Sequence, residues 1–180
     1  MRVIGGTYRS RRLIAPRGLA TRPTSDRLRE TLFNVLAARV EDAVFVDLYA
    51  GSGAVGIEAL SRGARMVYFV DQAAPAVAAI RENLAALEIS SGFQIVPGAV
   101  SAALRRIPER SAIIFLDPPY ASTEEYGRTI PELGELLTED GIVVAEHRRR
   151  MPEPLEEIYG TLRRYRVLEQ GDAGLSFYRK

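Results

Sequence analysis

The sequence has 180 residues, of which 47% are hydrophobic and 26% charged, and this suits one globular domain with its own core. The absence of cysteine excludes disulfides, and the single histidine, His147, leaves no basis for a histidine metal cluster, so we expect no metal. The formal net charge of +1 does not indicate a uniformly basic nucleic-acid-binding protein. No apolar run is long enough to cross a membrane and the first residues lack a secretory signal, so we expect a cytoplasmic protein without a membrane partner.

The chain begins with a segment rich in arginine and glycine. Residues 2–4 and 8–14, separated by Gly5-Gly6, predict a short β-hairpin, so we expect residues 1–22 to form a small extension and residues 23–180 to form the main domain. Residues 1–30 contain eight arginines and two acidic residues, whereas the remainder of the chain is net acidic. This asymmetry indicates an anionic partner near the N-terminal end.

Helical and strand-like patterns alternate through the rest of the sequence. A helix is predicted to start at Pro23-Thr24, with apolar positions on one face through Leu36. Short apolar runs predict strands, and amphipathic stretches between them predict helices. The predicted strands cover residues 44–47, 66–70, 93–96, 112–116 and 142–145, and the predicted helices cover residues 54–62, 73–87, 100–105 and 123–137.

The last part of the chain predicts an antiparallel hairpin, with strands at residues 162–168 and 175–178 joined by residues 171–174. Apolar strands that alternate with helices are typical of a parallel sheet covered on both faces. The sequence therefore predicts an α/β fold, which is a doubly wound, mostly parallel, seven-stranded Rossmann-like sheet. It adds an antiparallel C-terminal hairpin and the small N-terminal β-hairpin extension.

A glycine-rich turn follows the first predicted strand. Gly51, Gly53 and Gly56 have the G-x-G-x-x-G spacing, with Asp71 twenty residues after Gly51. This pattern is also that of dinucleotide-binding proteins, so an NAD-dependent oxidoreductase is an alternative. However, Asp47 ends the strand, and an acidic residue there favours a cationic ligand such as the ammonium group of S-adenosylmethionine and would repel a pyrophosphate. Asp71 can accept hydrogen bonds from both ribose hydroxyls in either case.

A second motif, Asp117-Pro118-Pro119-Tyr120, follows the fourth predicted strand, at the edge where ligands of open α/β sheets bind. The two prolines fix the backbone and remove two amide donors, which leaves the Asp117 carboxylate and the Pro118 carbonyl as acceptors. These acceptors can hold both hydrogens of an amino group on a base, while Tyr120 stacks on the ring. We therefore predict that Asp117, Pro118, Pro119 and Tyr120 are catalytic in methyl transfer to a base amino group.

Four segments carry a resemblance to a known family: residues 2–6, 22–34, 47–64 and 117–120. In these segments the sequence resembles the class I S-adenosylmethionine-dependent methyltransferases and, more closely, the bacterial RsmD family, which methylates the exocyclic N2 of a guanine in small-subunit ribosomal RNA. The resemblance implies S-adenosylmethionine as cofactor and S-adenosylhomocysteine as product. The cofactor-binding residues that it implies are Asp47, Tyr49, Ala50, Gly51, Ser52, Gly53, Asp71, Gln72, Ala99 and Thr24.

The resemblance also implies that Arg9, Arg11, Arg12 and Arg22 contact RNA, consistent with the charge asymmetry. The expected partner is small-subunit ribosomal RNA in a partly or fully assembled subunit, and we expect the protein to be a monomer. One position departs from the family, which commonly has Asp or Asn before the alanine that follows the strand at residues 93–96. Here Gly98 precedes Ala99, so that side chain is absent.

Other functions fit parts of the pattern. An adenine-N6 methyltransferase acting on DNA or RNA would use the same Asp117–Tyr120 motif, but such enzymes usually carry a target-recognition domain for which this chain has no room. A protein glutamine or a small-molecule amine as acceptor is less consistent with the N-terminal arginines. An oxidoreductase would need an acid–base residue, and His147, which heads Arg148-Arg149-Arg150, is better explained as part of a solvated or phosphate-facing cluster. The intact Asp117–Tyr120 motif argues against a non-catalytic RNA-binding factor.

Overall fold

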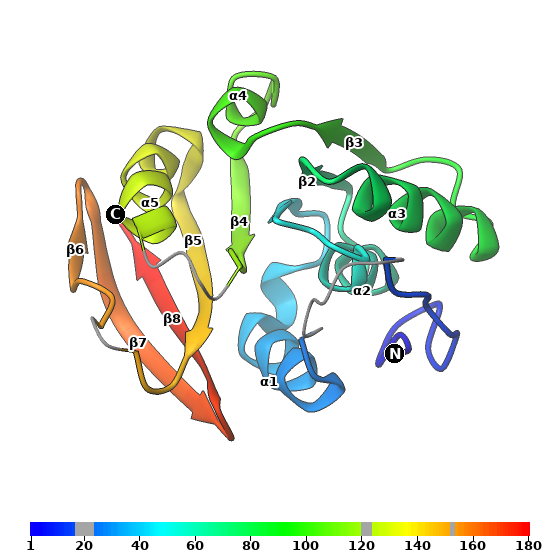
Figure 1. Ribbon diagram of the computed structural model, residues 1–180, viewed down its shortest axis with the longest axis horizontal. Helices are drawn as coiled ribbons and strands as arrows, with labels where there is room; N and C mark the ends of the chain where they lie inside the picture. Colours follow the sequence, from blue (N-terminus) through cyan, green and yellow to red (C-terminus); the bar gives the residue numbers. More distant parts are fainter. Residues whose placement is uncertain (17–23, 120–123, 152–153) are drawn as a thin grey trace.

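An eight-stranded sheet runs through the computed structural model, which describes residues 1–16, 24–119, 124–151 and 154–180 (Figure 1). The strands are β1 (Val44–Leu48), β2 (Met66–Asp71), β3 (Phe93–Pro97), β4 (Ser111–Leu116), β5 (Leu137–Arg148), β6 (Ile158–Tyr159), β7 (Leu162–Gln170) and β8 (Ala173–Arg179). The helices are α1 (Asp26–Leu36), the short 3-10 helix η1 (Ala37–Arg39), α2 (Ala54–Ser61), α3 (Ala74–Ala86), α4 (Val100–Leu104) and α5 (Glu124–Leu136). Within the described residues, none of the helices is both long and apolar enough to cross a membrane.

The strand order is β3-β2-β1-β4-β5-β8-β7-β6. The first five strands pair in parallel, and β8, β7 and β6 add antiparallel pairings at one edge. This confirms the predicted doubly wound α/β fold with an antiparallel C-terminal hairpin. The predicted number of seven strands is one too few, because β6 has only two residues and is too short to produce a periodic pattern.

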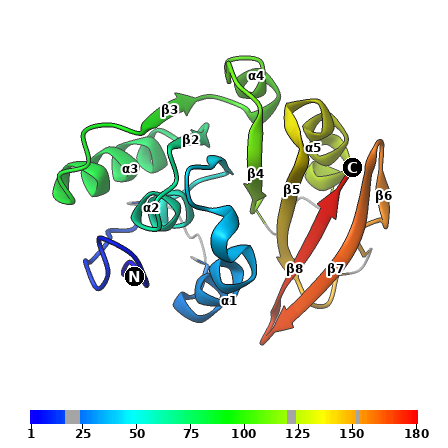
Figure 2. The ribbon, with the colours of Figure 1, turned by 180° about the vertical axis from the view of Figure 1, so that it is seen from behind.

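Helices cover both faces of the sheet, as the apolar strands require. On β1, Phe45 packs into a core formed with α1, α2 and α3, whereas its neighbours Val44 and Val46 pack into a second core with α4 and α5. This division follows from the alternation of side chains along a strand. Figure 2 shows the same layers from behind.

Two element boundaries differ from the prediction in ways that affect the site. Helix α1 begins at Asp26 and not at residues 23–24, because the Ser25 side chain caps it by accepting a hydrogen bond from the Leu28 amide at 3.1 Å. Strand β5 extends to Arg148, because antiparallel pairing with β8 continues past the parallel part of the sheet. Residues 146–148 therefore belong to β5, whereas the sequence predicted that the strand ends at residue 145.

The extension of β5 makes the prediction for His147 wrong. His147 is 8% exposed and pairs with Gly174 of β8, and its Nε2 lies 2.9 Å from the Ser176 hydroxyl. Burial lowers the pKa of His147, so a neutral imidazole is favoured there. The ring is therefore part of the packing between β5 and β8, and it is neither solvated nor directed at a phosphate.

The N-terminal segment, residues 1–16, folds back on itself and packs against the helices. Its two arms meet at one isolated bridge between Arg2 and Arg12, so the predicted hairpin is present as a loop and not as two regular strands. Val3 and Leu13 are buried in the same core as α1 and α2. Residues 1–16 thus share the hydrophobic core of the main domain, and the predicted boundary at residues 22–23 lies outside the described residues.

Buried ionic contacts fasten the segment to α1 and α2. The Glu58 carboxylate of α2 accepts hydrogen bonds from the amides of Ile4 at 2.7 Å and Gly5 at 2.8 Å. Arg29 is fully buried, pairs with Asp26 at 2.9 Å, and has its Nε 3.7 Å from Glu58. Part of the arginine excess near the N-terminus is therefore enclosed in the fold and is not available to an anionic partner.

Candidate active site

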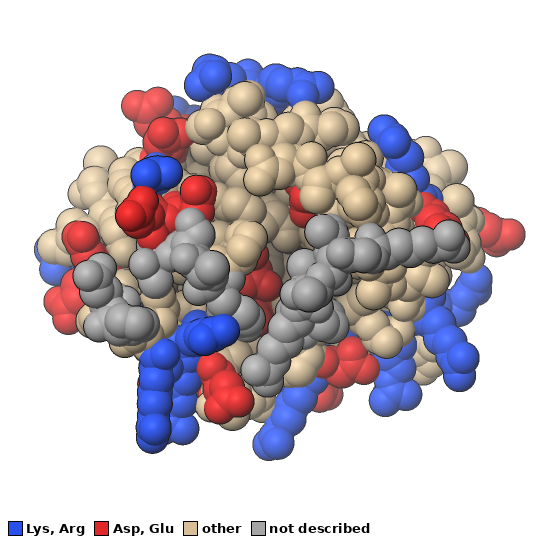
Figure 3. All heavy atoms as spheres, in the orientation of Figure 1, with Lys and Arg blue, Asp and Glu red and all other residues tan. Residues whose placement is uncertain are grey.

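Acidic side chains lie where several parallel strands end at the same edge of the sheet. Asp47 pairs with Phe115 of β4, and Phe115 pairs with Val144 of β5. Asp117 and Glu146 each lie two residues further along, so they are neighbours on adjacent strands and point to the same face as Asp47. Acidic atoms are visible in a central hollow of the molecular surface in Figure 3.

Asp47 lies at the bottom of this site. It is 1% exposed, and its Oδ2 accepts a hydrogen bond from the Gly56 amide in the first turn of α2 at 2.8 Å. The pKa of Asp47 is raised to about 8, mainly by burial, with the Gly56 amide lowering it and the charges of Asp71 and Glu146 raising it. The site therefore holds a buried carboxyl group whose ionised form a bound cation would stabilise.

Asp71 fixes the glycine loop to the end of β2. Its Oδ2 accepts from the Gly51 amide and its Oδ1 accepts from the Ala73 amide, both at 2.8 Å. The carboxylate is half-buried, so its remaining lone pairs are accessible to hydroxyl groups of a ligand. Gln72, the next residue, is exposed.

The glycines of the site have two different roles. A Cβ atom at Gly53 would lie 3.3 Å from the Phe69 ring, and one at Gly56 would overlap that ring, so these glycines allow α2 to pack on β2. In contrast, a Cβ at Gly51 would meet only the Tyr49 carbonyl oxygen at 3.9 Å, and one at Gly98 would meet nothing within 4 Å. Gly51 and Gly98 therefore border open space that a ligand could enter.

Tyr49 and Ala50 shape the loop between β1 and α2. Tyr49 has a φ of 59°, which is unfavourable for a side chain of its size, and its hydroxyl donates to Glu125 at 2.9 Å and lies 3.1 Å from the Thr129 hydroxyl. Burial, together with Glu125, raises the pKa of Tyr49 to about 12. Ala50 is buried and its amide donates to the Val70 carbonyl at 3.0 Å. The Tyr49 hydroxyl thus anchors the loop to α5.

The loop is also tied to the N-terminal segment through Asn83 of α3, a residue that the sequence analysis did not select. Asn83 is 2% exposed, and its Nδ2 donates to the carbonyls of Ser52 at 2.9 Å and Ile14 at 3.0 Å. Its Oδ1 accepts from the Ile14 amide at 2.8 Å. The signal in the sequence was a polar residue on the otherwise apolar face of the predicted helix.

Asp117 opens the second half of the site, on β4 and β5. It is half-buried, and burial, together with the charges of Glu146 and Asp47, raises the pKa of its carboxyl well above the ordinary value. Pro118 is buried and Pro119 is exposed, whereas Tyr120 lies outside the described residues. Asp117 is therefore more basic than an ordinary carboxylate and lies on the same face as Asp47.

Glu146 is the acidic residue that the sequence analysis missed. It is 2% exposed, and its Oε2 accepts a hydrogen bond from the Thr24 hydroxyl at 2.8 Å, which joins β5 to the residues before α1. The Tyr126 hydroxyl donates to the Glu146 carbonyl at 2.6 Å. Its position directly after the predicted strand at residues 142–145 is equivalent to that of Asp117 after β4, and this was the available signal.

The remaining predicted residues lie at the margins. Ala99 caps α4 at the end of β3. Arg9, Arg11 and Arg12 are exposed, but the turn that contains Arg9 lies beside the last turn of α2, where the Thr7 amide donates to the Ser61 carbonyl at 2.8 Å. Since α2 starts at the glycine loop, its length of about 12 Å separates this turn from the acidic site. Arg22 lies outside the described residues.

The strand order, the glycine loop and the carboxylates at the ends of β1, β2 and β4 are those of a class I methyltransferase. The family model described as conserved hypothetical protein 95 matches residues 1–179. This chain belongs to that family, the RsmD family of ribosomal RNA methyltransferases.

Individual relatives agree with this assignment. YlbH of Bacillus subtilis (strain 168), a candidate rRNA methyltransferase, is 38% identical over 184 residues, which cover 100% of this chain and 99% of YlbH. Ribosomal RNA small subunit methyltransferase D of Escherichia coli (strain K12) is 39% identical over 120 residues, which cover 67% of this chain and 60% of that protein. The solved structure of the candidate methyltransferase yhhF from Escherichia coli has a TM-score of 0.79 at 30% identity and covers 100% of this chain and 97% of its own.

Proposed function

We propose that this protein transfers a methyl group from S-adenosylmethionine to the exocyclic N2 amine of a specific guanine in small-subunit ribosomal RNA and releases S-adenosylhomocysteine. The observation that carries the proposal is the position of Asp117, which directly follows β4, the strand next to β1, and lies close enough to Asp47 for their charges to interact, in a chain of the RsmD family. A carboxylate for the acceptor amine is thereby adjacent to a buried carboxylate suited to a cationic cofactor.

The residues around the glycine loop fit S-adenosylmethionine. The buried Asp47 carboxyl is suited to the charged methionine end, and Asp71 retains lone pairs for the ribose hydroxyls. The open space beside Gly51 and Gly98 allows the backbone to approach a ligand closely. When bound, the cofactor supplies an electrophilic methyl group on a positively charged sulfur.

The Asp117–Tyr120 motif would hold the acceptor base. The Asp117 carboxylate and the Pro118 carbonyl accept hydrogen bonds from the two amino hydrogens, which orients the nitrogen lone pair toward the methyl group. Once the nitrogen is methylated, it becomes acidic and loses a proton to the Asp117 carboxylate. The raised pKa of Asp117 makes that carboxylate a better proton acceptor than an ordinary one.

We further propose that the substrate is RNA within a partly or fully assembled small subunit and that Arg9, Arg11, Arg12 and Arg22 contribute to its binding. The described arginines of this set are exposed, which is compatible with contacts to phosphate groups.

The decisive experiment maps methylated nucleotides in ribosomal RNA from a strain that lacks the protein. We expect one N2-methylguanine of the small-subunit RNA to disappear in mass spectrometry and to return when purified protein and S-adenosylmethionine are added to the isolated subunits. The appearance of N6-methyladenine in place of N2-methylguanine would contradict the guanine assignment. Protection against heat by NAD, without protection by S-adenosylhomocysteine, would contradict methyl transfer as a whole.

A further inference from the structure

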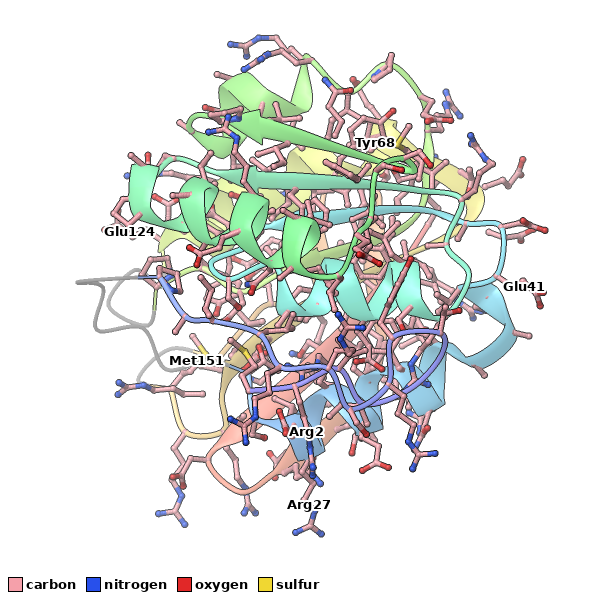
Figure 4. The ribbon with its side chains drawn as sticks, turned by 90° about the vertical axis from the view of Figure 1, so that its right-hand side faces the viewer. Arg2, Arg27, Glu41, Tyr68, Glu124 and Met151 are labelled. Atoms are coloured by element: carbon pink, nitrogen blue, oxygen red, sulfur yellow. The ribbon has the colours of Figure 1, made fainter. Side chains whose placement is uncertain are left out.

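Four arginines lie beside the half of the site at the ends of β4 and β5, which contains Asp117 and is here called the acceptor half. They are Arg27 in the first turn of α1 and Arg148, Arg149 and Arg150 at and after the end of β5, here called the rim arginines, and all four are exposed. Figure 3 shows basic side chains along the lower margin of the face that contains the central acidic hollow. Figure 4 shows Arg27 and Met151, the residue after Arg150, in the same half of the molecule, opposite Tyr68.

Contacts around the turn between β7 and β8 fix the positions of Arg27 and Arg149. With the Gln170 amide oriented to satisfy both its donor and its acceptor, its oxygen accepts from the Arg27 Nε at 2.9 Å. On the other side of the same turn, the Arg149 amide donates to the Asp172 carbonyl at 2.8 Å and its Nε lies 2.7 Å from Glu169. Gln170, Ala173 and Arg148 are cross-strand partners whose side chains share one face, whereas Glu169 pairs with Gly174 and points to the other face. Arg27 and Arg148 therefore lie on one surface although they come from opposite ends of the sequence, and the Arg149 side chain lies on the other side of the hairpin.

This surface adjoins the residues of the acceptor half. Arg148 lies two residues beyond Glu146 on β5, a separation of about 7 Å, and alternation directs both side chains to the same face. Glu146 in turn is hydrogen-bonded to Thr24, two residues before α1 begins. The rim arginines thus lie at the edge of the sheet where Asp117 is found.

An RNA substrate needs positive charge near the site, and these arginines can supply it. In the part of the chain that the structure describes, the centre of the site is lined by the carboxyl groups of Asp47, Asp71, Asp117 and Glu146 and therefore offers no cation to a polyanionic strand. An RNA whose base enters the site needs cations close to the flanking phosphates. Of the exposed arginines of the N-terminal segment, Arg11 lies at the last turn of α3, where it donates to the Ala86 carbonyl, and the turn that contains Arg9 lies beside the last turn of α2 (Figure 1). Arg2 lies at the first turn of α1, where its Nε is 3.5 Å from Asp26.

We propose that Arg27, Arg148 and Arg150 form an RNA-binding surface that holds the phosphates next to the target nucleotide. This inference rests on the proposed function and assigns the RNA backbone beside the acceptor base to a surface that the resemblance to the family did not indicate. Arg149 is not part of this surface, because its partner Glu169 lies on the opposite face of the hairpin from Gln170 and Arg148.

The test measures methylation of small ribosomal subunits, isolated from a strain that lacks the protein, by the double variant Arg27→Gln/Arg150→Gln. The KM for subunits is expected to rise on the order of tenfold at 0.1 M salt, and the salt dependence of kcat/KM is expected to weaken by about 1.4 logarithmic units per decade for two lost phosphate contacts to single-stranded RNA. The kcat at saturation, the Kd for S-adenosylhomocysteine and the melting temperature are expected to stay unchanged.

Two further variants make the outcome specific. Arg105→Gln/Arg110→Gln removes two exposed arginines at the end of α4 and directly before β4, and is expected to behave as wild type. Arg27→Lys/Arg150→Lys keeps both charges and is expected to recover most of the salt dependence. An unchanged salt dependence in the glutamine variant, or an equal effect in the control, would overturn the proposal.

The RNA partner is tested separately from the reaction. The glutamine variant is expected to lose affinity for protein-free small-subunit RNA as well as for subunits, and a loss confined to subunits would assign the surface to a ribosomal protein instead. If the wild-type protein methylates neither substrate, the proposed function fails; if it methylates them and the glutamine variant does so equally well, only the RNA-binding surface is refuted.

Discussion

On β1 and β2, the carboxylates of Asp47 and Asp71 accept hydrogen bonds from the backbone amides of Gly51, Gly56 and Ala73. At the ends of β4 and β5, in contrast, the charge of Glu146 raises the pKa of Asp117. Both pairs lie at the same edge of one sheet. The first pair holds the glycine loop in place by accepting hydrogen bonds from backbone amides. In the second pair, burial and the Glu146 charge raise the pKa of Asp117, and a strongly shifted pKa is expected for groups that act on a substrate.

This difference indicates that the two halves of the site will respond differently to mutation. Changes on β1 and β2 should affect cofactor binding and the stability of the protein without cofactor. Changes on β4 and β5 should affect the rate of methyl transfer and its pH dependence. The following predictions test that separation, starting with the largest expected effect.

Replacing Asp117 should abolish most of the catalytic rate. In Asp117→Asn the acceptor amine loses a charged hydrogen-bond partner and the proton loses its acceptor, so kcat should fall by about 10³-fold. The Kd for S-adenosylhomocysteine, measured by calorimetry, should change less than about threefold, because the carboxylates of Asp47 and Asp71 remain in place. Asp140→Asn, a change at an exposed aspartate in β5, serves as control. A large loss of cofactor affinity in Asp117→Asn would contradict the separation, because Asp117 would then also contribute to cofactor binding.

Replacing Asp47 should weaken the binding of S-adenosylmethionine. In Asp47→Asn the side-chain oxygen can still accept from the Gly56 amide, but the negative charge beneath the cofactor is lost. The Kd for S-adenosylmethionine should rise on the order of a hundredfold, since truncation of a buried charge pair costs several kcal/mol. An unchanged Kd would show that the charged end of the cofactor binds elsewhere.

The same carboxyl group predicts a pH dependence of stability. Because the folded protein holds the Asp47 pKa at about 8, above its unfolded value, the folded state binds the extra proton between about pH 4 and pH 8. The free energy of unfolding should therefore fall as pH rises through this window, by up to about 1.4 kcal/mol per pH unit from this group. Urea titrations of Asp47→Asn without cofactor should show a flatter profile and greater stability at pH 8.

Replacing Glu146 should alter the rate less than replacing Asp117 but should move its pH profile. Since the Glu146 charge raises the pKa of Asp117, the acid limb of kcat in Glu146→Gln should shift to lower pH, with a plateau up to about tenfold lower because Asp117 becomes a weaker base. The amide oxygen introduced by this substitution could still accept from Thr24, so the fold is expected to persist. Glu139→Gln, at an exposed position of the same strand, should leave the profile in place.

Replacing Asn83 should produce the smallest effect on activity. Asn83→Ala leaves the Ser52 and Ile14 carbonyls without their donor, which should lower the free energy of unfolding by about 1–3 kcal/mol. The KM for S-adenosylmethionine should rise a few-fold with kcat unchanged, because the glycine loop becomes less fixed. A fall in kcat at constant KM would contradict this prediction and would indicate that Asn83 affects the methyl-transfer step and not cofactor binding.

Local patterns predicted much of this molecule. Apolar runs and turn residues are sufficient for β1 to β4, and the two motifs at strand ends led to Asp47, Asp71 and Asp117, because a strand end at the carboxyl edge is a property of short sequence segments. Glu146 and Asn83 were missed because their importance depends on contacts with Thr24 and with Ile14 and Ser52, which are distant in sequence. His147 was misplaced because three arginines follow it, whereas its burial comes from pairing with β8.

Gly6 illustrates how closely the N-terminal segment depends on the helix that it crosses. Its φ is 74°, and a Cβ atom there would overlap the backbone carbonyl of Ser61 at the end of α2. In a library containing every single substitution, position 6 should therefore tolerate almost no replacement despite its exposure to solvent. A solvent-facing residue far from the chemistry would then rank with the acidic residues in mutational sensitivity, for reasons of geometry alone.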